Sequence, residues 1–312
     1  MLHNVASVQP ITINSPALTS KAKSVFAMEM LQHTVRKTVI CKGIGIHSGA
    51  DVTLKIKPSA EDTGFIFVRT DLTANNRVPA RWDTVVDTSM CTKIANNEGV
   101  SVSTIEHLMA AFRAVGIHNA LIEIDGPEVP IMDGSSIEFI RAIQQGGGIK
   151  PLSKPLKQIR VLKPIHIIQD KGQAWLLPAN ESRISIYFDG FGRFSTSWTF
   201  DYLPEEDDFT TLLSEARTFG FLEDGNKLRA RGLARGASLG NTIVIDEDQI
   251  MNDGGLRYED EFVRHKILDA YGDLMLVGVR LIGHFHGHNS GHGLNNQVLR
   301  ALFDDLNAWT YA

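Results

Sequence analysis

The residues best suited to chemistry lie at positions 259–273, which read EDEFVRHKILDAYGD. On a helix, His265 and Asp269 are four positions apart, so their side chains lie one above the other on a single face. An imidazole nitrogen and a carboxylate oxygen placed this way can bind one zinc ion, with bonds of about 2.0–2.2 Å. Asp273, one turn further on, could orient another histidine. The spacing indicates part of a metal site; a hydrogen-bonded surface pair is the alternative.

A second segment, residues 103–111 (STIEHLMAA), is the best source of a third ligand. A catalytic zinc ion usually has three protein ligands and one position open to water. Because neighbouring helical residues point about 100° apart, His107 can bind the metal while Glu106 takes a proton from a water that the metal activates. The alternative is a capping box, in which Glu106 and Ser103 only satisfy the helix N-terminus.

Alternating and helical patterns predict the elements that must position these residues. In the first half, strands are expected at 36–41, 50–57, 64–69 and 120–124, and helices at 103–115 and 135–144. In the second half, strands are expected at 159–168, 174–177, 184–188, 197–200, 241–245 and 281–286, and helices at 211–217, 259–277 and 295–306. Each half places a histidine near a helix start, which suggests a duplicated α+β unit with the site between the copies.

Composition divides the chain further. Residues 1–30 are rich in Ser, Thr, Asn and Pro without periodicity, and they lack the basic and apolar regions of a secretory signal, so they are expected to be a disordered extension. Residues 150–158 include Pro151 and Pro155 among polar residues and are the expected linker. The predicted domains are therefore 31–149 and 159–312.

Charge and cysteine content exclude several classes of protein. The chain has 312 residues and a net charge of −5, from 31 basic and 36 acidic residues, which does not suit binding to nucleic acid. No segment approaches the roughly 18 apolar residues of a membrane span. Two cysteines without a CxxC motif favour a reducing compartment. We expect a cytoplasmic monomer.

Two other motifs offer alternatives. Residues 236–240 (GASLG) match the G-x-S-x-G of serine hydrolases, with Ser238 followed by Asp269 and His292 in the required chain order. That mechanism needs a helix after the serine, whereas 241–245 reads as a strand. Alternating His284, His286 and His288 share one face of an extended segment, but no carboxylate or cysteine completes a metal site there, so a polar strand end is preferred.

A third class is a non-catalytic module that binds a sugar nucleotide or an acyl carrier. Its zinc would be structural, and structural sites usually have four protein ligands rather than three and a water. The glycine-rich residues 43–49 (GIGIHSG) do not fit a dinucleotide fingerprint, because the third glycine comes one place late and a strand follows. A hairpin loop near the substrate is the preferred interpretation.

Six ordered motifs resemble those of the UDP-3-O-acyl-N-acetylglucosamine deacetylases, zinc enzymes that commit Gram-negative bacteria to lipid A synthesis. The resemblance runs from about residue 31 to residue 309, and its motifs lie at 43–49, 103–107, 130–135, 216–220, 260–269 and 290–292. It implies that His107, His265 and Asp269 bind one zinc ion per chain and that Glu106 is the general base.

The same resemblance implies further roles. His292 would be the general acid, held in register by Asp273, and Thr218 would donate to the developing oxyanion. The substrate, a UDP-linked acylated glucosamine, would contact Lys266, Phe219 and Met90.

The family fold is α+β, with two similar domains whose helices pack together between two sheets. A hydrophobic passage in the second domain takes the acyl chain. The chain departs from the family at Asn289, where lysine is common, and in the passage region 228–241, which carries Arg231 and Arg235.

Overall fold

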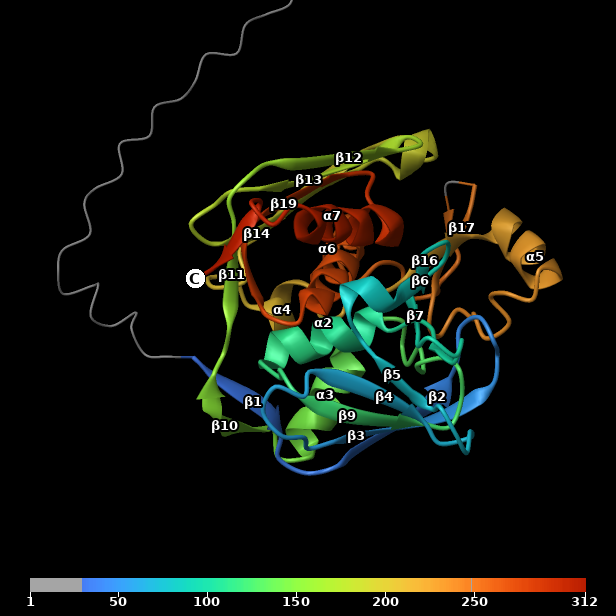
Figure 1. The fold of residues 1–312 in the computed structure, drawn as a ribbon. Coiled ribbons are helices and arrows are strands. Elements are labelled where there is room, and N and C mark those ends of the chain that lie inside the picture. The colour runs from blue at the N-terminus through green and yellow to red at the C-terminus, as the bar shows by residue number, and fades with distance from the viewer. Residues whose placement is uncertain (1–29, 248) are drawn as a thin grey trace, which may run out of the picture. The chain divides into compact units, whose positions relative to one another are not determined.

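Two large sheets face each other across a central group of helices (Figure 1). The structure is a computed structural model that describes residues 30–247 and 249–312, and Leu31–Ala312 forms one unit. The extension expected at residues 1–30 lies outside the described residues except for Met30. The expected fold class, α+β with helices between two sheets, is confirmed.

The first sheet has five strands in the order β2-β3-β9-β4-β5. Its inner face is apolar because every second residue of a strand points to the same side, as Val52, Leu54 and Ile56 do. The elements of this half are β1 (Leu31–Val35), β2 (Val39–Ile44), β3 (Asp51–Lys57), β4 (Phe65–Arg69), β5 (Arg77–Pro79), β6 (Val85–Asp87), β7 (Lys93–Ala95), β8 (Ser101–Val102), α2 (Glu106–Val115), β9 (Ala120–Ile124) and α3 (Ile137–Gln145).

The second sheet has seven strands. Five of them lie side by side in the order β12-β13-β19-β11-β20, while β14 pairs with β19 and β15 pairs with β14. The elements of this half are β10 (Ile149–Pro155), β11 (Gln158–Val161), β12 (Ile165–Gln169), β13 (Gly172–Leu177), β14 (Ser182–Phe188), β15 (Trp198–Tyr202), α4 (Phe209–Leu212), β16 (Phe219–Phe221), α5 (Leu222–Ala230), β17 (Ile243–Asp246), β18 (Gln249–Ile250), α6 (Glu261–Leu274), β19 (Arg280–His288), α7 (His292–Asp304) and β20 (Trp309–Tyr311).

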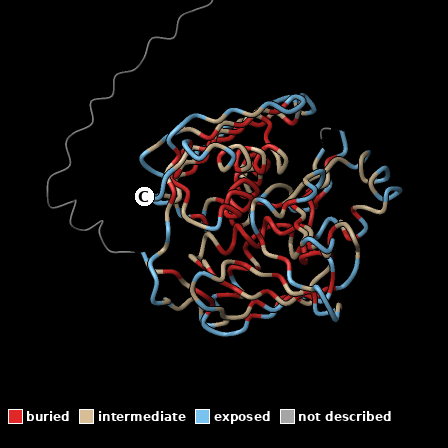
Figure 2. Tube along the Cα trace, in the orientation of Figure 1, coloured by how far each residue is buried: buried red, intermediate tan, exposed pale blue. Residues whose placement is uncertain are grey.

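Helix α6 is buried on almost every side, as expected for a helix inside a core. Figure 2 shows that the buried segments, in red, are concentrated in this central layer. Helix α2 lies very close to α6 at Gly272, where an added Cβ would lie 2.0 Å from the backbone oxygen of Glu106. Glycine at this position therefore lets the start of α2 reach the middle of α6.

Local signals explain where α2 ends. Gly116 adopts φ 77°, a left-handed conformation that costs glycine little, and the next N–H, of Ile117, donates to the carbonyl of Phe112. The end at Val115 matches the prediction. The helix begins at Glu106, three residues later than predicted.

Three segments differ from the sequence-based expectations. The helix predicted at 211–217 is wrong: α4 ends at Leu212, and the residues that follow bind side chains of α6 instead. The expected linker 150–158 largely forms β10, which pairs antiparallel with β1. Helix α5 was not expected, and its weakly apolar sequence gives little helical signal. The domain boundaries at 149 and 159 remain a prediction. None of the helices in the described residues is long and apolar enough to cross a membrane.

Candidate metal centre and active site

Helices α2 and α6 bring His107, His265 and Asp269 together, each buried. One ligand atom from each residue lies within 4.8 Å of the other two. Nε2 of His107 is 3.5 Å from Oδ1 of Asp269, and Nε2 of His265 is 3.4 Å from the same oxygen. The two imidazole rings meet edge to face, with centroids 4.9 Å apart. The three residues proposed from the sequence as metal ligands therefore converge from both halves of the chain.

These distances suit ligands that share one cation. Bonds of 2.0–2.1 Å in a tetrahedron separate the ligand atoms by about 3.3–3.4 Å, whereas N–H···O hydrogen bonds are about 2.7–3.2 Å long. Oδ1 of Asp269 is buried and has no hydrogen-bond partner, and the same holds for Nδ1 of His107. Buried polar atoms nearly always have a hydrogen-bond partner. The unpaired Oδ1 of Asp269 therefore fits the role of a cation ligand.

Neighbouring groups fix the ligands in the forms that a metal requires. Nδ1 of His265 lies 3.0 Å from the carbonyl oxygen of Ala216, which places the proton on Nδ1 and leaves Nε2 free. Burial lowers the pKa of His265 to about 4, so the ring is neutral. Burial opposes the charge of Asp269, but His265 and Lys266 outweigh it and hold its pKa well below the usual value. Nζ of Lys266 is 2.7 Å from Oδ2 of Asp269.

Glu106 is the first residue of α2 and points toward the same space. Its Oε2 accepts a hydrogen bond of 3.0 Å from the backbone N–H of Thr92. The capping-box alternative fails, because Ile105 is the N-cap residue and no side chain caps the helix. Burial raises the pKa of Glu106, against the attraction of His292 and His107. A carboxylate with a raised pKa is suited to take a proton from water.

His292, the first residue of α7, faces Glu106 across the site. Its Nε2 is 3.9 Å from Oε1 of Glu106, and its Nδ1 is 2.8 Å from Oδ2 of Asp273. Burial acts against a charged imidazole, but attraction to Asp273 and Glu106 prevails and raises the pKa of His292 to about 9. The ring is therefore protonated at neutral pH and can donate a proton.

A cavity of about 1020 Å³ opens over these groups. The other residues predicted from the sequence, Thr218, Phe219, Met90 and Lys266, all line it. Apolar residues of α5, β17 and the segments around them also line it, namely Leu222, Leu228, Ala234, Ala237, Leu239, Val244 and Met251, together with the charged Asp224 and Arg229. The cavity thus borders both the buried ionisable groups and a set of apolar side chains.

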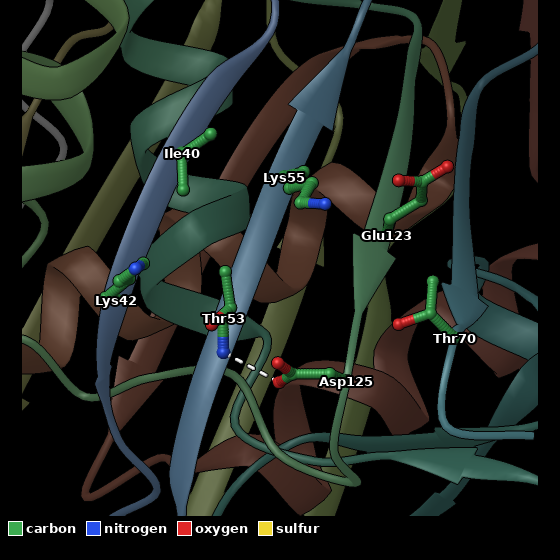
Figure 3. Close-up of a pocket in the computed structure, with 7 residues that line it drawn as sticks. All are labelled: Ile40, Lys42, Thr53, Lys55, Thr70, Glu123 and Asp125. Atoms are coloured by element: carbon green, nitrogen blue, oxygen red, sulfur yellow. Dashed lines mark hydrogen bonds between the residues drawn. The ribbon is translucent and has the colours of Figure 1, made fainter.

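A second hollow, of about 380 Å³, lies on the outer face of the first sheet (Figure 3). Its lining residues are Ile40, Lys42, Thr53, Lys55, Thr70, Glu123 and Asp125. Two lysines face two carboxylates there, and Asp125 accepts a hydrogen bond of 2.7 Å from the backbone N–H of Thr53. This hollow has two positive and two negative side chains, and it shares no lining residue with the cavity over the histidines.

The alternative motifs find no matching geometry. Ser238 lies in an exposed loop that leads into β17, so no helix follows the serine as a nucleophile elbow requires. His284, His286 and His288 occupy one face of β19, where His284 lies 2.7 Å from Oγ of Ser185. Within the described part of the chain, these three histidines do not converge as a cation cluster.

Three contributors were missed by sequence reasoning. Thr92 binds both Glu106 and Asp273, Asn295 donates to Asp273, and Ala216 accepts from His265 through its backbone. The Asn295 bond, Nδ2 to Oδ2, is 2.8 Å long. A backbone carbonyl leaves no signal in a residue pattern, and the isolated Thr92 has no periodicity that would single it out.

The fold and the site together indicate the class of the protein: a hydrolase, in which a carboxyl group and an imidazole face each other beside a cluster of possible metal ligands. The family model for UDP-3-O-acyl N-acetylglycosamine deacetylase matches residues 32–304. The chain belongs to this family, as its six motifs predicted.

Curated relatives agree with this assignment. A UDP-3-O-acyl-N-acetylglucosamine deacetylase of Shewanella sp. (strain W3-18-1) is 43% identical over 284 residues, which is 90% of this chain and 92% of the relative. The enzyme of the same name from Phenylobacterium zucineum (strain HLK1) is 43% identical over 281 residues, covering 90% of this chain and 96% of the relative.

Proposed function

We propose that the protein removes the N-acetyl group of a UDP-linked, 3-O-acylated glucosamine, giving acetate and a free amine, as the committed step of lipid A biosynthesis. Relatives that share 43% of their residues over 90% of the chain carry the name of this deacetylase. The observation that supports hydrolysis most strongly is the meeting of His107, His265 and Asp269 beside Glu106.

The proposed cofactor is one zinc ion per chain, held by His107, His265 and Asp269. Two imidazoles and a carboxylate, with one buried oxygen that has no hydrogen-bond partner, suit zinc in donor type and in spacing. When bound, zinc would polarise the amide carbonyl and lower the pKa of a nearby water.

The chain's own residues supply the proton transfers. Glu106 takes the proton from the water as its oxygen bonds to the amide carbon, and the hydroxyl of Thr218 donates to the oxyanion that develops on the carbonyl oxygen. The tetrahedral centre then collapses as the C–N bond breaks. His292, charged and held by Asp273, gives its proton to the leaving amine. Burial raises the pKa of Glu106, whereas the attraction between Glu106 and His292 favours the ionised carboxylate and the protonated imidazole that these steps need.

The two kinds of side chain that line the cavity suit the two ends of the substrate. Lys266, Phe219 and Met90 line it near the site and are proposed to contact the sugar. The apolar side chains at α5 and β17 are proposed to contact the acyl chain. We place the enzyme in the cytoplasm, because Cys41 and Cys91 are free thiols, as in reducing compartments. A monomer is the proposed oligomeric state.

Acetate release from UDP-3-O-acyl-N-acetylglucosamine by the purified protein tests the proposal. Turnover that disappears with a chelator and returns with zinc is expected. Labelling of Ser238 by a phosphonate probe with loss of activity would favour a serine hydrolase instead. Tight binding of the sugar nucleotide with no acetate released would favour a binding module.

A further inference from the structure

Thr92 is a small, fully buried residue that contacts the proposed base Glu106 and also Asp273, the partner of the proposed acid His292. It is 1% exposed and lies immediately before β7, in the first half of the chain. Its backbone N–H donates to Oε2 of Glu106 at 3.0 Å. Its hydroxyl donates to Oδ1 of Asp273 at 2.5 Å, across 181 positions of sequence.

The backbone of Thr92 is itself fixed to the start of α2. Its carbonyl accepts the N–H of Ile105, the N-cap residue, at 3.4 Å. Because threonine is branched at Cβ, its χ1 angle is restricted, and the hydroxyl then has a set direction. The position of the Thr92 hydroxyl is thus determined by the same helix start that places Glu106.

The hydroxyl completes the hydrogen bonding of Asp273. Oδ2 of Asp273 is taken by Nδ1 of His292 and Nδ2 of Asn295, both at 2.8 Å, while Oδ1 has the hydroxyl of Thr92. A carboxylate held at both oxygens cannot rotate about its χ2 angle without breaking a bond to a charged group, and such bonds are among the strongest. The imidazole of His292 is therefore oriented by a carboxylate that Thr92 locks.

We propose that Thr92 is a positioning residue that sets the proton donor His292 at a fixed distance from the base Glu106. The inference rests on the roles proposed above for these two residues. Thr92 is not among the residues that line the cavity, so it acts through Asp273 on one side and through Glu106 on the other.

Thr92→Val and Thr92→Ser test this directly. Valine keeps the shape and the backbone N–H but removes the hydroxyl, so kcat should fall about 10–100-fold, the range for outer partners of metal sites. KM and zinc content should stay unchanged. Serine restores the hydroxyl, so kcat should return to within about threefold of wild type, allowing for its freer χ1.

Thr34→Val is the matched control. Thr34 is also fully buried, and its hydroxyl accepts the N–H of Ser59 at 3.0 Å, far from the site in β1. The Thr34→Val substitution should lower the melting temperature by about as much as Thr92→Val while leaving kcat unchanged. A kinetic loss confined to the Thr92 variant separates positioning from general destabilisation.

Two further measurements, an NMR resonance and a double-mutant comparison, test the same proposal. In the metal-free protein, the low-field Nδ1 proton resonance of His292 should shift or broaden in Thr92→Val and be restored in Thr92→Ser. Asp273→Asn should lower kcat by a much smaller factor in the Thr92→Val background than in wild type. The effects of residues that act as a unit are not additive.

The inference is overturned if Thr92→Val turns over at the wild-type rate, if Thr92→Ser is as slow as Thr92→Val, or if the loss parallels a loss of zinc. The proposed function fails separately: the wild-type protein would then release no acetate from the substrate, whatever residue stands at position 92.

Discussion

Two carboxylic acids, Glu106 and Asp273, contact one imidazole, His292, and do different work. Glu106 is 3% exposed and accepts a hydrogen bond from the backbone N–H of Thr92, and burial raises its pKa. Asp273 is hydrogen-bonded to His292, Asn295 and Thr92, so its carboxyl group is held at both oxygens. The two environments therefore suit Glu106 to the proposed role of base and Asp273 to the proposed role of support for His292.

Replacing Glu106 with glutamine should separate metal binding from catalysis. Glutamine has the same size but cannot take a proton, so kcat should fall about 10²–10⁴-fold. The three proposed ligands are untouched, so zinc content should equal that of wild type. Parallel metal analysis and acetate release check this, and a variant with wild-type turnover would remove Glu106 from the mechanism.

The dependence of the rate on pH should have an acidic limb set by Glu106 and a basic limb set by His292. Glu106 works ionised, so the rate falls as pH drops through its raised pKa. His292 works protonated, so the rate falls as pH rises through about 9. In Asp273→Asn the carboxylate that supports the charge is gone, and the basic limb should move down by about one pH unit or more. An unmoved basic limb in kcat/KM would contradict the assignment of His292.

At the scale of elements, the site depends on how closely α2 approaches α6. Glu106 and His107 begin α2, whereas His265 and Asp269 lie one turn apart in α6. Gly272 of α6 is the contact point, with no room for a Cβ against the backbone of Glu106. The same helix crossing that closes the core therefore sets the distance between the base and the proposed ligands.

Gly272→Ala should damage both stability and activity. The methyl group would lie 2.0 Å from the oxygen of Glu106, so the helices must separate, and overpacking typically costs about 1–3 kcal/mol. Urea unfolding and kcat measure the two effects. Gly225→Ala in α5 is the control, because its Cβ meets nothing closer than 3.7 Å and alanine favours a helix by up to about 1 kcal/mol. Equal stability of the two variants would refute the crowding argument.

The elements that carry the chemistry were the most predictable ones. The four-residue spacing of His265 and Asp269 and the pairing of Glu106 with His107 are local, so the sequence displays them. The helix predicted at 211–217 failed, because its residues are committed to α6: Ala216 to His265 and Arg217 to the buried Glu261. Such tertiary bonds override propensity and leave no local pattern.

Contacts between distant segments account for the rest of what was missed. Thr92 and Asp273 are 181 positions apart, and nothing in either neighbourhood indicates the other. Likewise, β10 forms where prolines suggested a linker, because Pro151 and Pro155 can lie in a two-stranded sheet that has free edges. Family resemblance supplied the roles of His292 and Thr218, which spacing did not predict.

At the scale of the whole molecule, the proposed metal joins the two halves of the chain. His107 comes from the half that contains the five-stranded sheet, and His265 and Asp269 come from the other. A cation bound to all three would hold α2 against α6 in addition to the apolar core. Metal binding should then contribute to global stability as well as to chemistry.

Chelation should therefore lower the melting temperature. A ligand that binds only the folded state stabilises it by roughly 4 kcal/mol when its free concentration is about 1,000 times Kd. Dipicolinate should destabilise the wild-type protein and leave Asp269→Ala, which lacks a proposed ligand, nearly unchanged. Scanning calorimetry with and without added zinc checks this, and equal shifts in both proteins would point to zinc bound elsewhere.

The most direct test is the zinc content of purified wild-type protein and Asp269→Ala, determined by mass spectrometry on samples shown to be folded. Convergence of two imidazoles and one carboxylate on a single ion predicts about one zinc per chain in wild type and only a small fraction of that in the variant. Full zinc occupancy in folded Asp269→Ala would contradict the proposed metal centre.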